Sequence, residues 1–152
     1  MLIYFVVTII TIILYFFPKI IGKKIPSEIF FCLYFILLVL FGILRYGIGS
    51  DYKSYYNYFI SGDFFNGKFE FAFSLLSYII YYIFNNPYVY MGLLHMIIMI
   101  IIFYLIKKNS IDITLSILLF FYGFFYFDSL NIIRQYIAVE IAMLAIILFF
   151  KG

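Results

Sequence analysis

Two short stretches combine charged side chains with glycines or amides inside an otherwise apolar chain. The first, RYGIGSDYKSYYNYF at residues 45–59, contains an arginine, two glycines, an aspartate and five tyrosines. Arginine can hold a phosphate through two parallel hydrogen bonds, and glycines let backbone amides approach a ligand. An anion-binding turn at a membrane boundary is one interpretation of the stretch. The alternative is that Arg45 reaches lipid headgroups and the tyrosines form an ordinary aromatic belt.

The second stretch, DSLNIIRQYIAVEIA at residues 128–142, places ionisable side chains in an apolar segment. Charged groups inside a membrane are costly, so a functional role is the first hypothesis for Arg134, which we expect to face a wet cavity. Glu140 points elsewhere on the same helix and either pairs with another span or is protonated. A single helix through the stretch would bring five residues to one face: Asn131, Arg134, Gln135, Ala138 and Ala142.

His95, the one histidine, lies within the apolar sequence GLLHMIIMII. A proton relay is one interpretation, but a hydrogen bond to a neighbouring helix is favoured for a lone intramembrane histidine. No carboxylate cluster or second histidine accompanies it, so we predict no metal site and no cofactor. Cys32 is the only cysteine, which excludes an intramolecular disulfide.

The composition decides the class of protein that must position these residues. Hydrophobic residues make up 68% of the 152 residues and charged residues 11%, whereas globular domains have roughly 45–50% and 25%. Lipid must therefore surround the chain, which predicts an integral membrane protein. The net charge of +3 comes from scattered or paired basic residues, so nucleic-acid binding is not expected.

We predict an all-α fold, a polytopic transmembrane helix bundle of about six spans that forms a single domain over residues 1–152. Five spans are the alternative, because the segment at 71–84 is short enough to be a half-length or re-entrant helix. The predicted spans are the apolar segments at residues 2–17, 29–44, 71–84, 89–106, 113–127 and 132–150.

Residues 45–70 form a connection too long for a hairpin turn, and we predict that it contains a short aromatic helix at the membrane interface. Tyr52, Tyr55, Tyr56 and Phe59 have helical spacing, and Asp51 stands where an N-cap is expected. Tyrosine is favoured at that depth of a membrane.

The lysines leave the orientation of these spans open. With the N-terminus outside, the first connection, which carries Lys19, Lys23 and Lys24, is cytoplasmic. With six spans, however, Lys107 and Lys108 are then outside. The opposite orientation reverses both placements, so charge alone does not decide.

The two stretches, together with FEFAFSLLSYIIYYIFNNP between them, resemble the EpsG family of bacterial polysaccharide-biosynthesis membrane proteins, which is similar to O-antigen and capsule polymerases. The family pattern is R-x-G-x-G-x-D-Y, then E-P-G-[FY], then R-Q-x-[IL]-A. This chain departs from it at Phe71 and Ala72, where proline and glycine are expected, and Phe73 matches the aromatic position. The matching residues are Arg45, Gly47, Gly49, Asp51 and Tyr52, then Glu70, then Arg134, Gln135 and Ala138.

The resemblance implies a glycosyltransferase-type polymerase that joins polyprenyl-diphosphate-linked oligosaccharides at the outer face of the bacterial cytoplasmic membrane. It implies that Arg45 and Arg134 hold the diphosphate and that Asp51 or Glu70 is the general base. The 45–70 loop and the N-terminus would then be outside. Its partners would be membrane lipid, the lipid-linked oligosaccharide and other polysaccharide-assembly membrane proteins. Substrate contacts are expected from Arg45, Gly47, Gly49, Tyr52, Tyr55, Tyr56, Arg134 and Gln135.

Two other functions fit the same residues. A transporter or flippase for lipid-linked sugars could use these arginines and aromatics, although it would be expected to show paired discontinuous helices in two repeat halves. The resemblance covers only the N-terminal part of a typical family member, so an incomplete bundle without activity of its own is a further expectation.

Overall fold

Every element that the structure describes is a helix. The structure is a computed structural model that describes residues 2–21 and 27–151, and no strand occurs among them. The all-helical prediction is therefore confirmed. In chain order the helices are α1 (Leu2–Ile21), α2 (Ser27–Ile43), α3 (Tyr52–Ser61), α4 (Phe71–Phe84), α5 (Pro87–Asn109), α6 (Ile113–Tyr122), α7 (Phe125–Asn131) and α8 (Ile133–Lys151).

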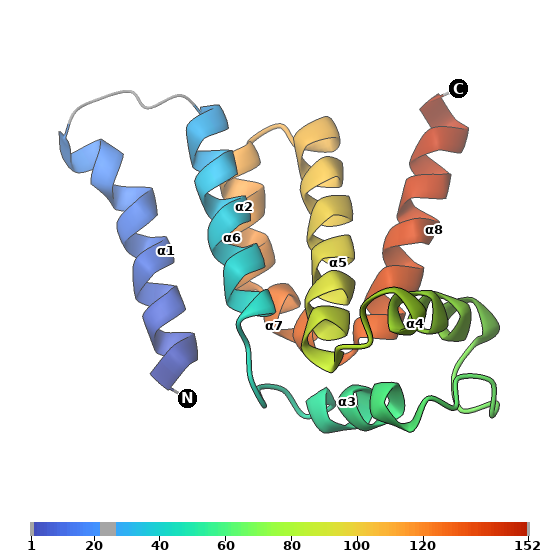
Figure 1. Cartoon of the computed structure of the whole chain (residues 1–152). Coiled ribbons are helices and arrows are strands. Elements are labelled where there is room, and N and C mark those ends of the chain that lie inside the picture. Colours follow the sequence, from blue (N-terminus) through green and yellow to red (C-terminus); the bar gives the residue numbers. More distant parts are fainter. Residues whose placement is uncertain (1, 22–26, 152) are drawn as a thin grey trace.

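The apolar helices α1, α2, α5, α6 and α8 stand upright beside one another, with α6 behind α2 (Figure 1). By length and composition, α5 and α8 qualify as membrane spans, and the bent pair α6 and α7 is a third candidate. Shorter apolar segments lie at Phe5–Phe16, Glu28–Ile43 and Phe71–Phe84. These lengths and the apolar composition agree with a helical membrane bundle.

Helix α5 is the centre of the bundle and packs against α2, α3, α4, α6 and α8. Its start is set by local chemistry, because Pro87 occupies the first turn and the Asn86 side chain accepts hydrogen bonds from the backbone of Tyr88 and Val89. A fully buried row, Leu94, His95, Ile98 and Met99, then faces the neighbouring helices.

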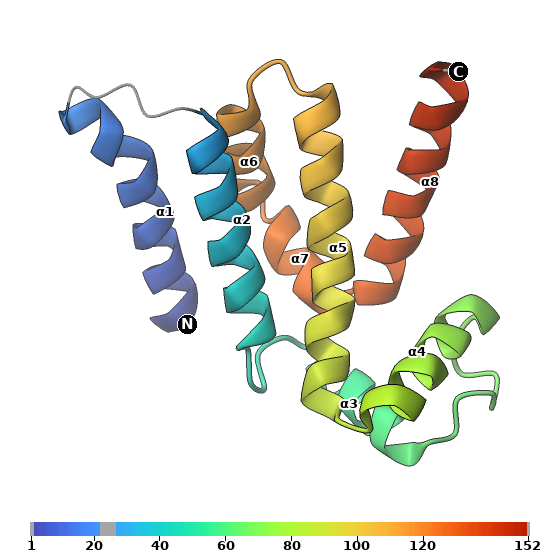
Figure 2. The ribbon, with the colours of Figure 1, turned by 45° about the horizontal axis from the view of Figure 1, so that its top comes forward.

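Helix α4 covers the predicted span at 71–84 but runs across one end of the upright helices, as both views show (Figures 1 and 2). This is the arrangement of the five-span alternative. Helix α3 lies at the same end, and the two helices share an aromatic core. In that core the Tyr58 hydroxyl donates to Phe64 O at 2.9 Å and lies 3.0 Å from Ser74 Oγ, within hydrogen-bond distance.

The predicted span at 113–127 consists of α6 and the first part of α7, which meet at an angle of 55°. The break falls at Gly123 and Phe124, where Phe124 has the left-handed backbone conformation with a φ of 65°. Helix α7 then ends at Asn131, and α8 begins only at Ile133. The chain is thus bent twice at the end of the bundle that carries α3 and α4.

Candidate functional site

Arg45 follows the end of α2 and turns toward α7 instead of toward the surroundings of the bundle. Its side chain is 4% exposed, and its Nη1 donates a hydrogen bond to the carbonyl oxygen of Leu130. The guanidinium also lies 5.9 Å from the centre of the Tyr52 ring. Because the side chain is buried between α3 and α7, it does not have the headgroup-facing position of the alternative interpretation.

The glycine-rich loop after Arg45 is attached to the same end of α7. The backbone N–H of Ser50 donates to Asn131 Oδ1 at 2.9 Å. Gly49 has a φ of +112°, and a Cβ there would lie 2.7 Å from the same Asn131 oxygen. Only glycine combines this backbone conformation with such a close approach. Gly47 also has a positive φ, +64°, but a Cβ there would meet no atom within 4 Å. Only its backbone conformation therefore favours glycine.

Helix α3 begins at Tyr52, as predicted, and Asp51 occupies its N-cap position. The Asp51 side chain caps no backbone N–H and instead accepts from Ser50 Oγ at 3.3 Å. Tyr52 and Tyr55 are buried, 5% and 4% exposed, and burial raises the pKa of Tyr52. Tyr56 is half-buried. Of the three predicted substrate-contacting tyrosines, Tyr56 is thus the one with ring surface to offer.

Two exposed tyrosines outside the predicted set extend this aromatic surface. Tyr88, in the first turn of α5, lies 5.7 Å from Tyr56 and 5.8 Å from Tyr46, measured between ring centres. Tyr56 is in turn stacked on Tyr52 at 6.0 Å. Tyr46 stands directly after Arg45, but no local pattern connects Tyr88 with it, because the fold alone brings α5 beside α3.

Glu70 and Arg134 form an ion pair across 64 residues of sequence. Nη1 of Arg134 lies 2.7 Å from both carboxylate oxygens of Glu70. The guanidinium also lies 4.5 Å from the centre of the Phe69 ring, which gives it a cation–π contact. Phe69 was not selected from the sequence, although it directly precedes Glu70. The pair joins the start of α4 to the first turn of α8.

The Glu70 carboxylate is held in its charged form. Hydrogen bonds from its own backbone N–H and from the Arg134 guanidinium lower its pKa below the ordinary value. Because the side chain is 69% exposed and Arg134 is 27% exposed, both are open to a ligand that approaches this end of the bundle. The Arg134 guanidinium is therefore already in position to bind an anion that displaces the Glu70 carboxylate.

The shared helical face predicted for residues 131–142 is only partly present. Asn131 ends α7, and Arg134 lies in α8 beyond the break at Ile132, so the two residues are not on one continuous helix. The prediction was wrong at this point because no proline or glycine in NIIRQ indicates a break. Asn131 contacts the 45–51 loop, and Arg134 contacts Glu70. Gln135 is exposed and lines a groove beside α8.

His95 lies inside the bundle, where α5 packs against α2. His95 is fully buried, and its Nε2 lies 3.3 Å from the Leu38 carbonyl oxygen of α2, which confirms the predicted hydrogen bond to a neighbouring helix. Among the described residues, no group of three or more His, Cys, Asp or Glu side chains could hold a metal ion.

Fold and site together define a helical membrane protein with an arginine–carboxylate pair and a tyrosine surface at one end of its bundle. A family model describes the same class of protein. The EpsG family model matches residues 28–152, and the chain belongs to this family, a polysaccharide polymerase-like membrane family. No curated protein and no solved structure gives a significant match.

Proposed function

We propose that the chain polymerises a bacterial surface polysaccharide by joining oligosaccharide units carried on polyprenyl diphosphate. The observation that carries this proposal is the Glu70–Arg134 pair, because it brings an exposed guanidinium and an exposed carboxylate together. Membership of a polymerase-like family supports the substrate class. Capsule, exopolysaccharide and O-antigen are the polymers to which such a reaction would apply.

In the proposed reaction, a hydroxyl of the acceptor sugar attacks the anomeric carbon of the donor sugar. The new glycosidic bond forms as the bond to the diphosphate breaks, and the polyprenyl diphosphate leaves with the bonding electrons. Arg134 stabilises the negative charge that develops on the leaving group. Gln135, which follows it and is exposed, is a further candidate for contact with the substrate.

The ion pair gives Glu70 a role that changes on substrate binding. While it is paired with Arg134, its lowered pKa makes it a weak base. When the diphosphate binds the Arg134 guanidinium, Glu70 loses its partner and its carboxylate becomes more basic. A general base for the acceptor hydroxyl requires this. Asp51, half-buried at the start of α3, is the second candidate for the base.

Arg45 and the glycines are proposed to position the site. Arg45 holds the 45–51 loop on α7 through Leu130, and Gly49 allows the loop to approach Asn131. Sugar rings would then stack on the exposed faces of Tyr46, Tyr56 and Tyr88 at the same end of the bundle. Aromatic rings suit this role because they present flat apolar surface with a polar edge.

We propose that this end of the bundle faces outside the bacterial cytoplasmic membrane. Helix α1 begins at the end that carries α3 and α4, whereas α5, with Lys107 and Lys108 in its last turn, ends at the opposite end (Figure 1). Because α4 does not traverse the bundle, those lysines share an end with Lys19 in the last turn of α1. Lys23 and Lys24 lie outside the described residues, between α1 and α2 in sequence. Lysine-rich ends favour the cytoplasm.

The test is the replacement of Arg134 by Gln in cells whose surface polymer depends on this protein. We expect short or absent polymer and accumulation of single repeat units on the lipid carrier at the outer face. Removing one donor to a developing anion typically costs roughly 100- to 1,000-fold in rate. The matched control is Lys68→Gln, because Lys68 lies over the same Phe69 ring at 5.5 Å but has no part in the proposed chemistry.

Three results would contradict the proposal. Unchanged polymer length in Arg134→Gln would show that Arg134 does not stabilise the leaving group. An equal defect in Lys68→Gln would show that the effect is general to this surface. Repeat units trapped at the inner face would indicate a flippase function instead of polymerisation.

A further inference from the structure

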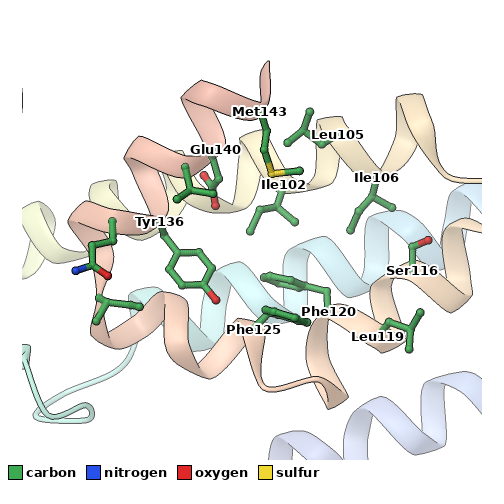
Figure 3. A pocket seen from close by; sticks show the side chains of 13 residues that line it. Ile102, Leu105, Ile106, Ser116, Leu119, Phe120, Phe125, Tyr136, Glu140 and Met143 are labelled. Atoms are coloured by element: carbon green, nitrogen blue, oxygen red, sulfur yellow. The ribbon is translucent and has the colours of Figure 1, made fainter. Parts of the chain in front are cut away.

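A groove between α8 and the helices α5, α6 and α7 shares Gln135 with the proposed polymerase site and extends away from it along α8. Its volume is about 530 Å³, and its walls are mostly apolar, with Ile102 on α5, Phe120 on α6 and Met143 on α8 (Figure 3). Val139 on α8 lines it as well. Helix α8 diverges from α5 toward its C-terminal end in both views (Figures 1 and 2). One long face of α8 is consequently left without a neighbour among the described helices.

A carboxylate lies in the wall of this groove. Glu140 is 3% exposed, and its side chain points from α8 into the space beside Ile102 (Figure 3). Neither carboxylate oxygen has a hydrogen-bond partner among the described residues. A carboxyl group buried in apolar surroundings is costly unless it is paired, and intramembrane acidic residues normally pair with a donor.

The described part of the chain offers Glu140 no basic partner. Arg134 lies six residues earlier on the same helix and is paired with Glu70. His95 is buried against the Leu38 carbonyl, on the side of α5 that faces α2. Lys107 and Lys108 lie in the last turn of α5. A second copy of the chain would therefore bring no accessible basic residue to the middle of α8.

The chemistry of the groove also discriminates between other occupants. An acyl or polyprenyl chain would fill apolar space but would supply no hydrogen-bond donor to Glu140. A diphosphate would find no basic side chain in the lining of the groove. A membrane-spanning helix with a basic side chain fits the groove in two ways. Its apolar side chains would contact the apolar walls, and its basic group would pair with Glu140. Opposite charges inside a membrane stabilise each other when water is excluded.

We propose that this groove binds a membrane-spanning helix of a partner protein, with a Lys, Arg or His side chain that pairs with Glu140. The docking face on α8 is a row at helical spacing, Val139, Met143 and Ile146, all of which are exposed. Ala138, Ala142 and Ala145 flank this row, and such small residues let two helices approach closely. The groove accepts one row of partner side chains, while the partner helix itself lies against α8.

The experiment places a photoreactive amino acid at Val139 or at Ile141 in the full chain, within native membranes. The two positions are a matched pair, because they are 58% and 54% exposed and lie on opposite sides of Glu140 around α8. We expect a protein cross-link from position 139 and only lipid adducts from position 141. Mass spectrometry of the cross-linked peptide should identify a membrane-spanning helix with a basic residue within one turn of the linked site. Lipid adducts alone at position 139, equal yields at both positions, or a linked peptide without a basic residue would overturn the proposal.

Glu140→Leu tests the charge pair in the same assay. This variant removes an unpaired buried carboxyl group, so the isolated chain in detergent should melt at the same temperature or higher. Loss of the cross-link from position 139 is therefore expected without loss of folding. Replacing Glu140 by Lys and the partner's basic residue by Glu should restore the cross-link. A Glu140→Leu chain that keeps its Tm and cross-links as before would overturn the proposed pairing, and failure of the exchanged pair to cross-link would do the same.

Discussion

The carboxylate of Glu70 lies 2.7 Å from Nη1 of Arg134, which ties the beginning of α4 to the first turn of α8. Both side chains are open to the surroundings, with 69% of Glu70 exposed. Exposed ion pairs contribute little to stability. Stability alone therefore gives little reason for this pair, and we propose that its role is to bind a ligand.

A double-mutant cycle separates these two roles. Glu70→Gln, Arg134→Gln and the double variant should show a coupling of only about 0.2–1 kcal/mol in the free energy of unfolding. Polymer length should fall in all three variants. Thermal or denaturant unfolding in detergent gives the first quantity, and gel analysis of the surface polymer gives the second. A coupling of several kcal/mol would mean that the pair is mainly structural.

The pH dependence of stability should report the Glu70 carboxylate. Its pKa is lowered in the folded chain, first by its own backbone N–H and then by Arg134. The folded state therefore binds this proton less readily than the unfolded state does. The stabilisation is present above the ordinary pKa of 4.5 and is lost as the pH falls below it. Comparison of Tm at pH 7 and at pH 3.5 should show a smaller decrease for Glu70→Gln than for the wild-type chain.

The exposed tyrosines should contribute to substrate binding without contributing to folding. Tyr88→Ala removes the ring that joins Tyr46 and Tyr56, and we expect roughly 0.5–1.5 kcal/mol of lost binding for one aromatic contact. Polymer formation at limiting amounts of lipid-linked substrate measures this effect. Tyr82→Ala is the control, because Tyr82 is 81% exposed on α4. Equal losses of polymer formation in the two variants would contradict the proposal that sugar rings stack on Tyr88.

The helices with strong local signals could be predicted from the sequence. Asn86 and Pro87 set the start of α5, because capping and proline act within one turn. Asp51 occupies the N-cap position of α3 as its residue type suggests, although its side chain caps no backbone N–H. The direction of α4 could not be predicted, since its apolar residues fit either a span or a helix packed on α3. The break at Ile132 has no local signal at all.

The site was predictable as a set of residue types but not as a set of contacts. Arg45 and Arg134 stand out because ionisable side chains beside or within apolar sequence are unusual, whereas Glu70 is indicated only by the resemblance to the EpsG family pattern. Their partners depend on how distant helices meet. The pairing of Arg45 with Leu130 and of Ser50 with Asn131 follows from the position of α7, which no pattern in residues 45–59 contains.

Gly49→Ala should loosen the loop more than Gly47→Ala does. Both glycines have positive φ, so alanine at Gly47 should cost roughly 1–2 kcal/mol for the left-handed conformation alone. At Gly49 the added Cβ would also meet Asn131 and disturb its hydrogen bond with Ser50. Protection of the Ser50 amide from hydrogen exchange distinguishes the two variants. Equal protection in both would mean that the Asn131 contact does not hold the loop.

Gly42→Ala tests how closely α2 and α5 pack. A Cβ at Gly42 would overlap the ring of His95, which is buried and hydrogen-bonded to Leu38. Overpacking of this kind costs about 1–3 kcal/mol, which exceeds the gain of about 1 kcal/mol from better helix propensity. Gly92→Ala is the matched control, because its Cβ would lie 3.4 Å from Ile43, at ordinary contact distance.

These two glycine variants should differ in their effect on the unfolding temperature. Gly42→Ala should lower the Tm in detergent, while Gly92→Ala should leave it unchanged or raise it. His95→Ala in the Gly42→Ala background removes the overlapping ring and should cost less than it does in the wild-type chain. If the two substitutions were simply additive, the ring of His95 would not be the atom group that limits the approach of α2 to α5.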